Sequence, residues 1–92
     1  MGMSFPILKR GRADTFESRL KRARNEGYVC GTREAKLFRL AVGKVFEREQ
    51  ALDWLSTAID DGRTELQDQH ALEREIEAWD MSCRIAFMVG IT

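Results

Sequence analysis

The chain has 92 residues, with fifteen Lys or Arg side chains balanced by fifteen Asp or Glu and a single His. This length predicts one domain and leaves no room for a large substrate cleft beside the core. Because 43% of the residues are hydrophobic, 33% are charged and only one is proline, the composition favours a soluble helical domain over a disordered chain or a turn-rich β fold.

Residues 1–12 are expected to form a basic, flexible arm, because two glycines and Pro6 oppose helix formation. The arm contains no long apolar run, and the longest apolar run of the chain, residues 85–89, is far too short to cross a membrane. We therefore expect no secretory signal, no membrane contact and a cytoplasmic location. The remaining residues, 13–92, are predicted to form a single helical domain.

A first helix is predicted to begin at Asp14 and to end before Gly27. Asp14 can cap the helix, Glu17 stands where it completes a capping box, and Gly27 is typical of a residue that follows a helix end. The apolar residues of this segment recur at helical spacing and form one narrow stripe: Phe16, Leu20 and Ala23.

A second helical segment is predicted from Thr32 towards Asp60, and it is apolar on two sides. Its main seam follows helical spacing and consists of Phe38, Val42, Val45, Leu52, Leu55 and Ile59. A second apolar face consists of Leu40, Trp54 and Ala58. Such a helix lies at the centre of a bundle or at an oligomer interface. Gly43 and residues 47–49 are the expected break points if the segment is two helices rather than one.

A turn is predicted at residues 61–63, and a last helix is expected to open at Thr64, with Gln67 completing a capping box. Its main apolar seam consists of Leu72, Ile76, Trp79, Cys83 and Phe87. Further apolar residues line another side, namely Ala71, Ala78, Met81, Ile85 and Val89. Because the final turn is apolar almost all round, we expect it to be buried or to meet a partner.

These elements predict an all-α fold, a small helical bundle of three to four helices. The two long segments would pair as an antiparallel hairpin across residues 61–63. Helices that are apolar on two sides give the chain more apolar surface than one small core needs, so we expect a homodimer.

Residues that carry catalysis or bind metals are scarce. His70 is the single histidine and has no nucleophile motif beside it. Cys30 and Cys83 are far apart in the sequence and lack metal-ligand spacing. We expect them to be free thiols in a reducing compartment, with a disulfide between them only if the protein is exported. The sequence therefore predicts no enzyme activity, no catalytic residue, no cofactor and no metal site.

The zero net charge hides a strong asymmetry between the two halves of the chain. Residues 1–48 hold twelve basic and five acidic side chains, whereas residues 49–92 hold three basic and ten acidic ones. The halves therefore carry +7 and −7 respectively. Either the two halves pair with each other, within one fold or across a dimer, or each meets a charged partner.

The favoured interpretation is a small non-enzymatic protein-binding module, such as an adaptor, a chaperone or an inhibitor of a host complex, of the phage or plasmid accessory type. It rests on the two-sided apolar helix, the apolar last turn and a stripe of carboxylates in the last helix. A tryptophan on such a surface is the expected hot spot. The predicted interface residues are Leu40, Trp54, Ala58, Glu73, Glu77, Asp80, Ile85, Met88 and Val89.

The alternative interpretation is a small nucleic-acid-binding regulator that uses the N-terminal arm and the first helix. Dense arginines and lysines suit phosphate contacts, and such binding weakens with salt. The candidate residues are Lys9, Arg10, Arg12, Arg19, Lys21, Arg22 and Arg24. The zero net charge argues against this alternative, because dedicated nucleic-acid-binding domains are usually basic overall.

Overall fold

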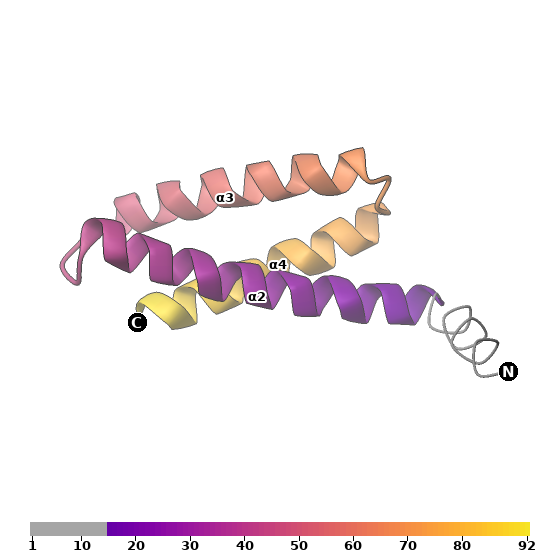
Figure 1. Cartoon of the computed structure of the whole chain (residues 1–92), viewed down its shortest axis with the longest axis horizontal. Coiled ribbons are helices and arrows are strands. Elements are labelled where there is room, and N and C mark those ends of the chain that lie inside the picture. Colours follow the sequence, from indigo (N-terminus) through magenta and orange to yellow (C-terminus); the bar gives the residue numbers. More distant parts are fainter. Residues whose placement is uncertain (1–14) are drawn as a thin grey trace, which may run out of the picture.

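The computed structural model describes residues 15–92. Within that range the chain forms three α-helices and no strand, which confirms the all-α class there. Helix α2 spans Phe16–Val42, α3 spans Arg48–Asp68 and α4 spans Glu73–Ile91. The chain runs along α2, returns along α3 and turns back along α4 (Figure 1). The arm expected at residues 1–12 lies outside the described residues.

Helices α2 and α4 run in the same direction and make the most extensive contact in the fold (Figure 1). Where they meet, α2 presents a row of small buried residues, namely Ala23, Gly27, Gly31 and Ala35. A Cβ atom on Gly27 would overlap the carbonyl oxygen of Trp79, and one on Gly31 would overlap that of Cys83. The missing side chains therefore let the two helix backbones touch.

The core sits where all three helices meet. Phe38 of α2 and Phe87 of α4 are fully buried, with their rings edge to face and their centroids 5.9 Å apart. The buried residues confirm most of the predicted seams and include Phe38, Leu55, Ile59, Ile76, Trp79, Cys83 and Phe87. The exposed exceptions are Phe16, Val45, Leu52 and Leu72. Val45 is the most exposed of them, at 92%, because it lies in the loop between α2 and α3.

The helix boundaries that the sequence predicts at Gly27 and Gly62 are wrong. Helix α2 continues through Gly27, because the contact with α4 outweighs the low helix propensity of glycine. The expected turn at residues 61–63 lies inside α3, so the two long segments do not pair across it. A Cβ atom on Gly62 would overlap the indole ring of Trp79, so this glycine makes room for a side chain.

The helices begin at residues other than those expected. Thr15, rather than Asp14, caps α2, and its Oγ1 accepts a hydrogen bond from the backbone N–H of Ser18 at 3.2 Å. Thr64 does not open the last helix, because it lies inside α3, where its hydroxyl donates to the carbonyl oxygen of Asp60 at 3.0 Å. Helix α4 begins after Leu72, whose N–H donates to Glu75.

A residue with a positive φ follows each of the helices α2 and α3. Gly43 has a φ of 97° and follows the last residue of α2, so the predicted segment 32–60 is interrupted at an anticipated position. The expected start at Thr32 is wrong, because residues 32–42 continue α2, and the rest of the segment belongs to α3. His70 has a φ of 63°, which is uncommon for a residue with a side chain. The N–H of Ala71 donates back to the carbonyl of Leu66 at 3.0 Å, which satisfies one of the last carbonyls of α3.

Gly31→Ala is expected to lower the free energy of unfolding by about 1–3 kcal/mol, because the added methyl group must push α2 away from α4. The gain in helix propensity, about 1 kcal/mol, offsets part of a larger steric loss. Urea unfolding followed by circular dichroism measures the change. Thr32→Ala, at the adjacent exposed position of α2, is the control and should leave the protein at least as stable. No loss in Gly31→Ala would show that the backbones do not touch.

Candidate functional site

An open groove of about 1180 Å³ lies between α2 and α3. The two helices meet where Phe38 stands against Trp54, with ring centroids 5.4 Å apart. Further along, α3 is fastened to α4 instead, because Gly62 lies against the indole of Trp79 and Arg63 pairs with Asp80. The side of α3 that faces α2 is therefore left open over much of its length.

The groove has an apolar interior. Phe38 and Trp79 are its most deeply buried large residues, and the other apolar lining residues are Val29, Cys30, Val42, Trp54, Ala58 and Leu66. The indole Nε1 of Trp54 donates a hydrogen bond to Oε1 of Glu34 at 2.9 Å, across the groove. This bond holds the half-buried Trp54 ring in the wall, where one of its sides can meet a ligand.

Carboxylates dominate the charged residues of the groove. Five of the lining residues are acidic, namely Glu26, Glu34, Asp53, Asp61 and Glu65, and one is basic, Arg33. Arg33 Nε lies 3.9 Å from Glu34 Oε2 and offsets part of the charge. The groove is therefore negative, although the whole chain carries no net charge.

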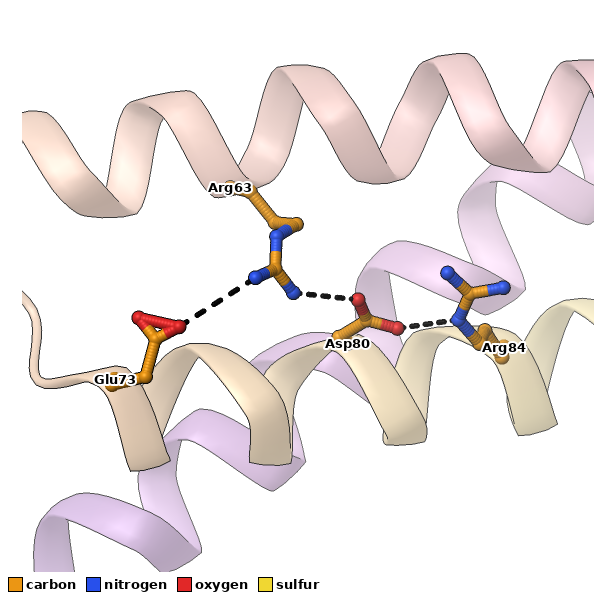
Figure 2. A network of polar contacts seen from close by, with 4 residues as sticks. All are labelled: Arg63, Glu73, Asp80 and Arg84. Carbon is orange, nitrogen blue, oxygen red and sulfur yellow. Dashed lines mark hydrogen bonds and ion pairs between the residues drawn. The ribbon is translucent and has the colours of Figure 1, made fainter.

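A second polar cluster fastens α3 to α4. Figure 2 shows Arg63 of α3 between Glu73 and Asp80 of α4. The Arg63 Nη1 lies 2.8 Å from Asp80 Oδ2, and its Nη2 lies 3.7 Å from Glu73 Oε2. The other oxygen of Asp80 accepts a hydrogen bond from Nε of Arg84. Only 9% of Asp80 is exposed, so the two guanidinium groups compensate a buried negative charge.

The predicted apolar interface residues fall on separate surfaces. Trp54 and Ala58 line the groove. On the side of α4 that faces away from the core lie Ile85, Met88 and Val89, which are exposed by 56%, 38% and 60%. Met81 extends this outward face with 64% exposure, and the prediction did not include it. Leu40 is 83% exposed near the end of α2.

The predicted carboxylate stripe is not a continuous exposed surface. Glu73 and Asp80 both belong to the cluster around Arg63, and Asp80 is buried. Glu77 is exposed on α4. These carboxylates of the last helix therefore serve mostly to join α3 to α4, and the acidic residues of the groove come from α2 and α3.

Only some of the predicted nucleic-acid-binding residues lie in the part of the chain that the structure describes. Lys9, Arg10 and Arg12 lie outside the described residues. Arg19 donates two hydrogen bonds to the carboxylate of Glu75 of α4, at 3.2 and 3.1 Å. Lys21, Arg22 and Arg24 are exposed on α2. Nucleic-acid binding through these residues stays a prediction.

The two cysteines are at least partly buried, whereas the single histidine is exposed. Burial, and then the neighbouring thiol of Cys30, raises the pKa of Cys83 to about 12, so Cys83 is protonated at neutral pH and is a poor nucleophile. His70 is exposed in the loop after α3 and is not buried beside either thiol. Among residues 15–92 no three His, Cys, Asp or Glu side chains are placed to hold a metal ion. No helix of the same range is long and apolar enough to span a membrane.

No family model, no curated protein and no solved structure matches this chain.

The wall of the groove that α3 contributes has a signal in the sequence. Trp54, Ala58, Asp61 and Glu65 recur at intervals of four, three and four residues, which places them on one face of a helix. Because the sequence predicts a turn at residues 61–63, Asp61 and Glu65 are not expected on the same helix as Trp54 and Ala58. The wall that α2 contributes has a similar signal, because Glu26, Cys30, Glu34 and Phe38 recur at intervals of four residues. The sequence does not show how far α3 stands from α2.

Asp80→Asn is expected to lower the free energy of unfolding by about 1–3 kcal/mol, because Arg63 and Arg84 lose the anion that they share. Asp60→Asn, at an exposed position of α3, is the matched control and should change stability by less than about 0.5 kcal/mol. Chemical denaturation of both variants measures the difference. Equal stability of the two variants would mean that the cluster does not fasten α3 to α4.

Proposed function

We propose that the chain is a small non-enzymatic protein-binding module, acting as an adaptor, chaperone or inhibitor, and that the groove between α2 and α3 holds a helix of the partner protein. The observation that supports this proposal most directly is the open groove, with its apolar interior and the half-buried Trp54 in its wall. Docking of an amphipathic helix into an apolar groove is a recurrent mode of protein recognition.

The dimensions of the groove suit a helix. Its lining follows α3 from Gln50 to Leu66 and ends at Gln69, the residue after the helix. The part beyond the bond between Trp54 and Glu34, residues 57–69, is about 18 Å long at the rise of an α-helix, so a partner helix of about 12 residues matches it. Its apolar side chains would cover Val29, which is 64% exposed, and the open side of Trp54, an aromatic residue of the kind that dominates binding energies.

Ala58→Arg is expected to abolish capture of the partner, because the new side chain fills the groove and places an unpaired charge against its apolar interior. The measurement is affinity capture from a lysate of the source organism with tagged wild-type protein, followed by mass spectrometry. Ser56→Arg adds the same side chain at an exposed position of α3 that does not line the groove. A partner retained by Ser56→Arg and lost by Ala58→Arg supports the proposal.

A partner retained equally by both variants would show that binding uses another surface. Circular dichroism must give the same helix content and melting temperature for the two variants and the wild type, since loss of the fold would also release a partner.

We also propose that two copies of the chain associate through the outward face of α4. Met81, Ile85, Met88 and Val89 lie on this face at helical spacing, and each is at least 38% exposed. A twofold axis through the middle of the face would bring each apolar patch against its own copy. This association leaves the groove between α2 and α3 open.

Ile85→Lys is expected to convert the dimer into a monomer, because a charge would be buried at the centre of the interface. Multi-angle light scattering should give about twice the chain mass of 10.6 kDa for the wild type and 10.6 kDa for the variant. Thr32→Lys, on the exposed surface of α2, is the control and should remain a dimer. A monomeric wild type at tens of micromolar would refute self-association through α4.

A further inference from the structure

The charges of the groove are distributed over both walls. Glu26 and Glu34 lie on α2, whereas Asp53, Asp61 and Glu65 lie on α3. Glu34 is the least exposed of these with 19% of its side chain accessible, and the hydrogen bond from Trp54 and the contact with Arg33 hold it in place. A ligand that enters the groove therefore meets three carboxylates on α3 and two on α2, of which Glu34 is already paired.

The same groove also has apolar surface on both of its walls. Trp54, Ala58 and Leu66 on α3 face Val29 and Cys30 on α2 across the same groove. A carboxylate that is desolvated without a partner is strongly unfavourable. An uncharged helix would cover the apolar surface, but it would remove water from the carboxylates without offering them a positive charge. An acidic helix or a nucleic acid would be repelled by the carboxylates.

We propose that the groove recognises a basic amphipathic helix, with an apolar stripe for its interior and Lys or Arg side chains beside that stripe. This inference rests on the proposed function, since it names the class of partner for the same groove. Cations beside the stripe would reach the carboxylates of the α3 wall, Asp53, Asp61 and Glu65, so one orientation of the helix satisfies the apolar and the charged groups together.

The test uses three synthetic helical peptides of about 18 residues, which is long enough to cover the open part of the groove. All three carry the same leucine stripe, and the flanking positions hold lysine in the first peptide, glutamine in the second and glutamate in the third. Fluorescence anisotropy of labelled peptide measures binding to the full chain at low and at physiological salt. Emission of Trp54 and Trp79, which both line the groove, reports whether the peptide lies there.

The lysine peptide is expected to bind at least about tenfold more tightly than the glutamine peptide, and to weaken as salt rises. Asp61→Lys combined with Glu65→Lys should remove that preference. Asp60→Lys combined with Glu77→Lys makes the same change in net charge at exposed positions outside the groove, and it should retain the preference. The pair of variants therefore separates the charge of the groove from the charge of the whole protein.

Equal binding of the lysine and glutamine peptides would overturn the basic-helix proposal and leave the groove as a binding site for a helix. Failure of all three peptides to bind would overturn the proposed function as well. If a synthetic peptide of residues 1–14 binds more tightly than the lysine peptide, the groove is assigned to the chain's own N-terminal segment. A dimer that Asp61→Lys with Glu65→Lys dissociates in light scattering would assign it to a second copy. Either assignment overturns the proposal of an external partner.

Discussion

The arrangement of this protein depends on direct contact between the backbones of α2 and α4. Gly27 and Gly31 of α2 meet the carbonyl oxygens of Trp79 and Cys83 of α4, and Gly90 of α4 makes room for the side chain of Ala35. Because α4 lies so close to α2, α3 is fastened largely to α4, through Trp79 and the Arg63 cluster. The groove between α2 and α3 is therefore a consequence of how α2 and α4 pack.

The class of the fold and much of its core could be predicted from apolar spacing alone. Phe38, Leu55 and Phe87 recur at helical intervals, and the structure buries all three. The boundaries failed at Gly27 and Gly62, because the sequence shows a glycine without showing what lies opposite to it. A turn needs glycine for its backbone angles, whereas these two positions need it for the absence of a side chain.

The candidate site could be predicted only in part. Trp54 and Ala58 were assigned to a second apolar face of a helix, and that face does line the groove. Asp80 was assigned to an exposed stripe because acidic residues are usually solvated, yet it pairs with arginines that come from two helices. A pairing between α3 and α4 depends on the loop that joins them, and helical spacing carries no information about that loop.

The parallel contact between α2 and α4 also bears on how the chain folds. Gly27 and Trp79 meet although all of α3 and two loops lie between them in the sequence. Neither neighbouring pair of helices can supply this contact, so the chain must close a long loop before its closest packing forms, at an entropic cost that rises with the logarithm of loop length. Helix α3 acts as a stiff spacer within that loop. A bundle held chiefly by helices adjacent in sequence avoids this step, so the present topology favours slower folding than three helices alone would suggest.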